Sequence, residues 1–426
     1  MNVTERKVGY QERWLSETFF EMREAFSLTS MIGFTGDVDY KLFSKAWKIL
    51  FQRQPMLRTR LHREEEGYLL TFDADFDDVP LLETNTDDKE HWKNIFHDHF
   101  FPQLDINTYC WKAELVNVND SSEHQVIFTT VHTISDALSM SYLLGDLLRI
   151  IIALKHNEKV DTTSIEVPPP VDDILNKRLF LPSNTDISVN EPPWKFQEAY
   201  DVNRSRTSCI FDVIGKSKVD AVLQRARKES VTFTSAFCAA FAKSIAKMRG
   251  RSGKYHVPMS IVLDLRKYSD PIQGWDIFCF YAAKRLSDLR LDSNQPFWDN
   301  ARQVQSEIDR ILLEFKLPDP EDHTKELNAY MDAWKDSLAA QQFAVPGAVS
   351  NLCEIDSSFS DIEPDFIVNG FYFSIGINVP LMPMIIFLAT IKGECHLCCT
   401  YTEPALSSQQ AEELAANTIK YLDGSV

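Results

Sequence analysis

The chain has 426 residues, of which 44% are hydrophobic and 12% aromatic, so it is long enough for about two to three domains with substantial cores. Its formal charge is -18, from 44 basic and 62 acidic residues. Binding to a phosphate backbone requires a clustered positive surface, so this balance argues against nucleic acid as a partner.

The first part of the chain predicts a mixture of helices and strands. Amphipathic patterns indicate helices over Asp39–Arg53 and Lys89–His99, and strand-like runs cover Tyr68–Phe72 and Trp111–Val118. An apolar, β-branched run then ends at Val131. We assign residues 1–165 to an N-terminal lobe of α/β class.

A histidine and an aspartate follow that run at the start of an apolar helix over Leu138–Leu148. His132 titrates near neutral pH and can take up and return a proton. Asp136, four positions on, is better placed to hold structure than to share that proton. Ser135 and Ser139 flank the motif and are expected to cap the helix, since no second histidine is near enough to activate either as a nucleophile.

The chain changes character between the two halves. Pro168–Pro170 and Pro192–Pro193 stand among Asn and Ser residues, a composition typical of extended segments with weak internal packing. We interpret residues 166–205 as a crossover linker.

The second half, residues 206–426, again mixes strands and helices and forms a second predicted lobe. Strands are predicted over Ser208–Val213, His256–Leu263, Phe371–Ile377 and Cys395–Thr402, and helices over Gly215–Arg227, Thr234–Met248, Trp298–Leu317 and Ser407–Leu422. The aromatic runs Phe278–Tyr281 and Phe371–Phe373 either line a pocket for an apolar molecule or belong to the core.

Cysteine usage predicts reduced, buried thiols, because the eight cysteines stand mostly in apolar stretches without the density of a disulfide framework. Cys395 and Cys398 have the Cys-x-x-Cys spacing of zinc ligands, but no second ligand pair has suitable spacing. We therefore expect a strand there and no metal site.

No membrane segment is expected. Residues Met1–Lys7 lack the features of a signal peptide. The most apolar stretch, Leu138–Leu154, is interrupted by Gly145, Asp146 and Arg149 and falls short of the roughly 20 residues that span a bilayer. These observations favour a cytoplasmic location, with peripheral membrane contact left open.

The segment Val131–Ala137 resembles the active-site motif of the acyl-CoA-dependent acyltransferase superfamily. This group includes alcohol O-acyltransferases, polyketide-associated acyltransferases and the condensation domains of nonribosomal peptide synthetases. Four further stretches are similar to family segments in order and approximate spacing: Gln54–Leu61, Val231–Ala242, Val262–Arg266 and Val349–Cys353. The resemblance covers nearly the whole chain.

Two departures from the family pattern bear on the reaction. Condensation domains usually carry two adjacent histidines followed by an aspartate-glycine pair, whereas Val131 and Ala137 occupy the corresponding positions here. Amide formation is therefore disfavoured. The DFGWG loop of the plant alcohol acyltransferases is also missing, so the chain resembles the fungal or bacterial branch.

The resemblance implies a fold of two chloramphenicol-acetyltransferase-like lobes with a tunnel between them, and His132 at its middle as general base. It implies a structural role for Asp136, paired with Arg266, unless Arg266 is merely a solvated strand-end residue. Ser350 and Asn351 would donate hydrogen bonds to the substrate or the oxyanion, or else form a polar strand end.

The function implied is O-acyl transfer from coenzyme A, with acetyl-CoA the expected donor, to the hydroxyl of a hydrophobic small molecule. Acyl-CoA would be a co-substrate rather than a permanently bound cofactor, and we expect a monomer. Two alternatives remain open. One is a condensation-type synthase that takes the acyl group from a carrier protein and forms an ester or an amide, and the other is a non-catalytic scaffold of the same fold.

Overall fold

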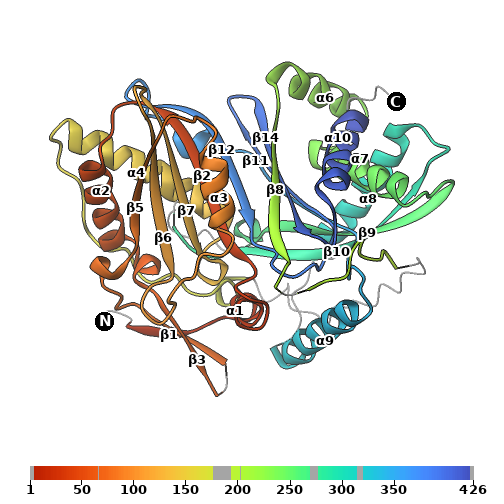
Figure 1. The fold of residues 1–426 in the computed structure, drawn as a ribbon, viewed down its shortest axis with the longest axis horizontal. Coiled ribbons are helices and arrows are strands. Elements are labelled where there is room, and N and C mark those ends of the chain that lie inside the picture. The colour runs from red at the N-terminus through yellow and green to blue at the C-terminus, as the bar shows by residue number, and fades with distance from the viewer. Residues whose placement is uncertain are drawn as a thin grey trace. The chain divides into compact units, whose positions relative to one another are not determined.

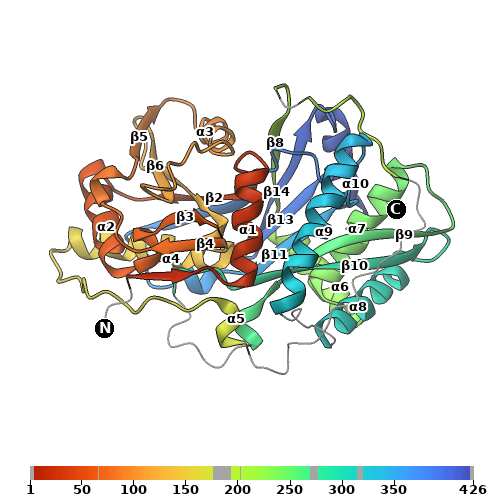
Figure 2. The same ribbon diagram turned by 90° about the horizontal axis from the view of Figure 1, so that it is seen from below.

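The computed structural model describes residues 4–65, 67–175, 193–201, 203–268, 277–313 and 320–422 (Figures 1 and 2). It divides into two compact units. Unit 1 comprises Met1–Leu175, Asp264–Ala282 and Glu354–Gly376, and unit 2 comprises Asn176–Leu263, Ala283–Cys353 and Ile377–Val426. Each unit combines a β-sheet with helices, so the predicted α/β class with two lobes is confirmed.

Unit 1 contains, among its described residues, a five-stranded sheet of order β12-β2-β7-β6-β5. Its strands are β2 (Ser27–Thr35), β5 (Leu81–Thr86), β6 (Trp111–Val118), β7 (Glu123–Val131) and β12 (Ile367–Ile375). Only the edge pair β5–β6 is parallel within this described sheet. The central strands β2 and β7 are buried almost throughout, which explains why β2, and β7 from Val126 on, are continuously apolar or small rather than alternating.

The helices of unit 1 cover both faces of this sheet. They are α1 (Tyr10–Glu21), α2 (Tyr40–Arg53), α3 (Trp92–Asp98), α4 (Ala137–Lys155) and α5 (Val171–Ile174), with short 3-10 turns at Pro55–Arg58, Phe76–Asp78 and Asp356–Phe359. Figure 1 shows α2 and α4 on one face and α3 on the other. On the first face, Trp47 of α2 packs on Trp111 and Phe128, with ring centroids 4.8 and 5.1 Å away.

A smaller sheet of β1 (Glu5–Lys7), β4 (Gly67–Thr71) and β3 (Arg60–Glu64) completes the described strands of unit 1. Helix α1 lies beside this sheet, as Figure 2 shows, and also packs against the 3-10 turn His132–Ile134. The N-terminal segment therefore supports the chain immediately around the predicted base.

The apolar stretch Leu138–Leu154 is expected from its sequence to be too short to span a bilayer, and the observed helix α4 differs from this expectation. It has 19 residues and is long and apolar enough to cross a membrane by length and composition alone. However, 61% of its most apolar window is buried inside the protein, as in a core helix. Gly145 allows α4 to pack closely against the 3-10 turn Asp356–Phe359, because a Cβ atom at this position would lie 2.0 Å from the Ser358 carbonyl oxygen. No other described helix passes the same test.

Unit 2 contains, in its described part, a six-stranded sheet of order β10-β9-β11-β13-β14-β8. Its strands are β8 (Arg206–Ile214), β9 (Lys254–Asp264), β10 (Ala282–Asp292), β11 (Ala348–Glu354), β13 (Ile385–Ile391) and β14 (Glu394–Glu403). Its helices are α6 (Lys216–Lys228), α7 (Phe233–Met248), α8 (Phe297–Leu313), α9 (Pro320–Ala339) and α10 (Ser408–Leu422). Helix α7 packs between α8 and α10.

The segment with the Cys-x-x-Cys spacing is a strand, as predicted. Cys395, Cys398 and Cys399 are buried in β14, where burial raises the pKa of Cys395 to about 12. Among the described residues, no group of three or more His, Cys, Asp or Glu side chains is arranged to hold a metal ion.

The unit boundaries differ from the contiguous lobes predicted for residues 1–165 and 206–426. Two segments of the second half, 264–282 and 354–376, belong to unit 1. The later segment pairs as a strand, since β12 is hydrogen-bonded to β2 from Ile367 opposite Thr35 to Ile375 opposite Leu28. The earlier segment is bonded to Asp136 through Arg266 and Tyr281. Within the predicted linker 166–205, residues 166–175 belong to unit 1 and the described residues from 193 on belong to unit 2. Residues 176–192 and 202 lie outside the described residues.

Asp172 of α5 binds the N-terminus of α1. Its Oδ2 accepts a hydrogen bond from the backbone N–H of Tyr10 at 2.6 Å, and its buried Oδ1 has no partner among the described residues. A Cβ atom on Gly9 would lie 2.3 Å from Oδ2, so this contact requires glycine. Burial and the nearby charge of Glu12 raise the pKa of Asp172 to about 6. The folded chain therefore favours the protonated carboxyl of Asp172 more than the unfolded chain does.

Replacement of Asp172 by Asn should change the pH dependence of stability. Because the pKa is higher in the folded than in the unfolded chain, the wild type loses stability as pH rises from about 4 to about 6. The variant should lack this loss and gain about 2 kcal/mol over the wild type at pH 7.5, but little at pH 4. Thermal melts at both pH values test this. The exposed Asp78, changed to Asn, controls for net charge, and an equal gain at both pH values in the Asp172 variant would contradict the argument.

Candidate active site

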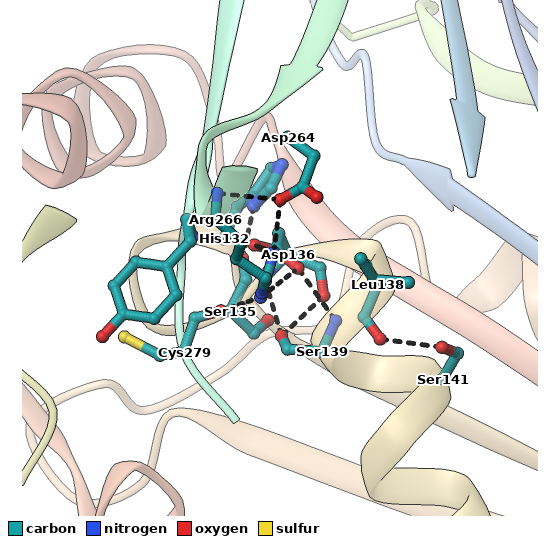
Figure 3. A network of polar contacts seen from close by, with 10 residues as sticks. His132, Ser135, Asp136, Leu138, Ser139, Ser141, Asp264, Arg266 and Cys279 are labelled. Carbon is teal, nitrogen blue, oxygen red and sulfur yellow. Dashed lines mark hydrogen bonds and ion pairs between the residues drawn. The ribbon is translucent and has the colours of Figure 1, made fainter. Parts of the chain in front are cut away.

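His132 lies where the central strand β7 ends. The strand pairs with β2 as far as Val131 and with β6 as far as Thr130, and the chain then forms a 3-10 turn over His132–Ile134. Ser135 returns to an extended conformation, and α4 begins directly after Asp136. The strand end, the turn and the helix start therefore bring His132 and Asp136 into one small region (Figure 3).

One imidazole nitrogen of His132 is held by the backbone. Nδ1 lies 2.6 Å from the carbonyl oxygen of Ser135, and this oxygen can only accept a hydrogen bond. Nδ1 therefore carries the hydrogen, and the unshared electron pair of the neutral ring is on Nε2. We find no hydrogen-bond partner for Nε2 in the described part of the chain. Nε2 is thus the atom available for proton transfer.

The surroundings of His132 keep the ring neutral. Burial lowers the pKa of His132, and the hydrogen bond to Ser135 and the charge of Asp136 only partly oppose this. The side chain is nonetheless not fully enclosed, because it retains intermediate exposure. A neutral, partly accessible imidazole with its electron pair on Nε2 has the properties of a general base at neutral pH.

Asp136 makes its contacts away from the imidazole. Its side chain caps α4 by accepting from the backbone N–H of Ser139 at 2.8 Å, and the Ser139 hydroxyl in turn accepts from the Asp136 N–H at 3.1 Å. Its second oxygen accepts from the backbone N–H of Tyr281 at 2.7 Å. The helix cap is therefore Asp136, with Ser139 as its reciprocal partner, whereas the buried Ser135 hydroxyl has no partner among the described residues.

The ion pair implied by the resemblance is present. Arg266 Nη1 lies 2.9 Å from Asp136 Oδ2, Nη2 lies 3.1 Å from Oδ1, and both side chains are about 95% buried. Arg266 stands in the 3-10 turn Leu265–Tyr268 that follows β9 and also donates to Asp264 at 3.2 Å (Figure 3). The alternative of a solvated strand-end arginine is wrong.

Ser350 and Asn351 lie on β11 of unit 2, whereas His132, Asp136 and Arg266 are brought together in unit 1. The Asn351 amide donates to the Thr234 hydroxyl of α7 at 2.9 Å and accepts from the backbone N–H of Cys353 at 2.8 Å. These bonds hold the end of the strand, where Cys353 has a left-handed backbone with φ of 62°. Ser350 is buried and, as the neighbouring residue in the strand, faces the opposite side of the sheet.

Two contacts of the site were not predicted. Phe280 packs its ring against His132, and the Tyr281 backbone holds Asp136. The aromatic run Phe278–Tyr281 is evident in the sequence, but nothing in it indicates that it contacts a motif nearly 150 positions earlier. A backbone N–H donor has no signature in the sequence at all.

The comparisons with known proteins give a family match over part of the chain and a shared fold. Residues 8–167, which include His132 and Asp136, match the family described as condensation domain. Among solved structures, the trichothecene 15-O-acetyltransferase TRI3 from Fusarium sporotrichioides has a TM-score of 0.76 at 12% identity, over 99% of this chain and 95% of that one. The search of curated proteins returned no match.

Two further structures share the fold. Polyketide synthase associated protein 5 from Mycobacterium tuberculosis has a TM-score of 0.68 at 14% identity, over 99% of this chain and 98% of that one. The first condensation domain of the CDA synthetase has a TM-score of 0.69 at 12% identity, over 99% and 95%. The predicted resemblance is confirmed at this level, and the chain has the fold of the condensation-domain-like acyltransferase superfamily.

Replacement of Asp136 by Ala should destabilise the protein by about 3–5 kcal/mol, because it leaves Arg266 buried without its main counter-charge and removes the cap of α4. The Asp264→Ala variant removes a carboxylate from the same arginine, but one that is 25% exposed, so its loss should be much smaller. Denaturant unfolding of both variants measures the difference. Equal stabilities of the two would contradict a structural role for Asp136.

Replacement of Cys353 by Gly should stabilise the protein, since a non-glycine residue in the left-handed region is strained. The Cys353→Ala variant removes the same thiol but keeps the strain. We expect the free energy of unfolding, measured by thermal melts, to be about 0.5–1 kcal/mol higher for the glycine variant than for the alanine variant. This difference already includes the added entropy of the unfolded glycine chain. A glycine variant less stable than the alanine variant would show that the turn is not strained.

Proposed function

We propose that this protein is an acyltransferase that moves an acetyl or longer acyl group from coenzyme A to the hydroxyl of a hydrophobic small molecule. The arrangement of His132 carries the proposal. Its Nδ1 is occupied by the Ser135 carbonyl, its Nε2 is available, and burial lowers its pKa. The fold shared with an O-acetyltransferase and with condensation domains supports the same chemistry.

The proposed reaction needs one base and no covalent enzyme intermediate. His132 Nε2 takes the proton from the acceptor hydroxyl as its oxygen attacks the thioester carbonyl carbon. The tetrahedral intermediate collapses, the carbon–sulfur bond breaks, and the proton on Nε2 passes to the departing thiolate. The products are an ester and free coenzyme A, and His132 returns to its starting form.

The bond from Nδ1 to Ser135 supports this cycle in both protonation states. In the neutral ring it fixes the tautomer and the ring orientation, and in the imidazolium the same N–H remains bonded while Nε2 carries the transferred proton. The Asp136 carboxylate, which is engaged with Arg266 and Tyr281, would not exchange the proton.

Ser350 and Asn351 stay the proposed hydrogen-bond donors to the substrate or to the negative charge on the intermediate. The Asn351 amide is already engaged with Thr234 and Cys353. Acyl-CoA would bind as a co-substrate, and we retain the proposals of a cytoplasmic monomer and of a tunnel that admits donor and acceptor.

A second candidate is a condensation-type synthase that takes its acyl group from a carrier protein. The family match over residues 8–167 favours it, because that family is the condensation domain. Against amide synthesis stands Val131, a fully buried residue of β7 at the position where condensation domains usually carry a first histidine. A non-catalytic scaffold is disfavoured by the intact arrangement of His132.

Replacement of His132 by Ala should lower kcat by at least about 10²-fold with little change in thermal stability, because only the proton-transfer step is lost. The assay measures free-thiol release from acetyl-CoA with a panel of hydrophobic alcohols and amines. His156→Ala, at an exposed histidine just after α4, is the matched control and should retain activity. The wild-type rate should decline only below the ordinary histidine pKa of about 6.5.

The same assay separates the candidates. Thiol release from acetyl-CoA with alcohols supports the main proposal, and release only from an acyl-loaded carrier protein supports the second. Near-normal turnover by the His132→Ala variant would overturn the mechanism, and a wild type inactive with every donor and acceptor would favour the scaffold.

A further inference from the structure

The residue next to the imidazole of His132 is Phe280, on a segment that follows 269–276, which lie outside the described residues. The two ring centroids are 5.3 Å apart and the ring planes are at 88°. Phe280 is only 5% exposed, so its ring is packed in place rather than free to turn in solvent. None of the motifs that identified the site includes this residue.

The backbone around Phe280 is held on both sides. Tyr281 donates its N–H to Asp136 at 2.7 Å, and its carbonyl accepts from the Leu265 N–H at 2.9 Å. On the other side, Phe278 packs against Phe128 of β7, with ring centroids 5.8 Å apart. The position of Phe280 is therefore determined by the core and by the same carboxylate that binds Arg266.

We propose that Phe280 is a positioning residue for the general base: its ring packs against the imidazole, restricts its orientation together with the Ser135 carbonyl, and excludes water from one side of it. The inference rests on the proposed function of His132. Asp136 then acts on the base indirectly, because its carboxylate holds the Tyr281 backbone and thereby places the neighbouring Phe280 ring against His132.

Removal of the Phe280 ring has a predictable electrostatic consequence. Burial is the main cause of the lowered pKa of His132, so water admitted beside the ring should stabilise the imidazolium and raise that pKa. The charged groups nearby are already in ion pairs. The charged and titratable groups packed around His132 and the segment 278–281 are Asp136, Arg266, Asp264, Arg6, Glu12, Cys279 and Tyr281.

The test compares Phe280→Ala and Phe280→Leu with Phe278→Leu as the matched control. Phe278 belongs to the same buried segment but packs against Phe128. Histidine labelled with ¹³C and ¹⁵N in the whole protein allows an NMR titration of His132, whose signals are assigned by their loss in the His132→Ala variant. The titration needs no substrate, and steady-state kinetics with acetyl-CoA and an alcohol provide the second readout.

We expect Phe280→Ala to raise the pKa of His132 by roughly 0.5 to 1 pH unit and to lower kcat by roughly tenfold with KM nearly unchanged. Phe280→Leu should show a smaller effect in the same direction, and Phe278→Leu should leave the titration as in the wild type. If Phe280→Ala does not fold, Phe280→Leu decides.

An unchanged His132 titration in a folded Phe280 variant overturns the proposal, as does an equal change in the Phe278 control. Its failure can be told from failure of the proposed function. A wild type without acyl transfer in any assay contradicts that function even where the titration responds to Phe280, and an active wild type with an unresponsive titration contradicts only the role of Phe280.

Discussion

The buried ion pair between Asp136 and Arg266 is the interaction on which the rest of the candidate site depends. The Asp136 carboxylate receives bonds from both Arg266 nitrogens and from the backbone N–H groups of Ser139 and Tyr281. It thereby joins the start of α4, the end of β9 and the segment that carries Phe280. A charge pair that is removed from water is stable only when its remaining hydrogen bonds are satisfied, and here they are.

The geometry separates two tasks within one short motif. His132 lies in a 3-10 turn with its Nδ1 directed at a backbone carbonyl, and Asp136 lies at the helix cap with its carboxylate directed at an arginine. A spacing of four residues therefore does not produce a His–Asp proton relay in this protein. The aspartate determines where the backbone around the histidine lies, and in the proposed reaction it is the histidine that exchanges the proton.

The fold is retained with very little sequence identity, 12% to the trichothecene 15-O-acetyltransferase. In this chain a strand end, a turn and a helix start place His132 and Asp136, and Arg266 reaches them from the other half of the sequence. Two segments of the second half, 264–282 and 354–376, belong to unit 1. The first of them matters for the site, because it carries Arg266 and Phe280.

The sequence by itself determined the local elements and the motif. Alternation and amphipathic spacing identified β6, α2 and α7 within a residue or so of their observed ends, since these patterns depend only on which side of an element is buried. Resemblance, and not periodicity, indicated the pairing of Asp136 with Arg266. Only the tertiary structure placed β12 beside β2, Phe280 against His132 and Asp172 at the start of α1. Each of these contacts joins residues more than 140 positions apart, and the partners of a buried edge, ring or carboxylate are chosen by how the whole chain packs.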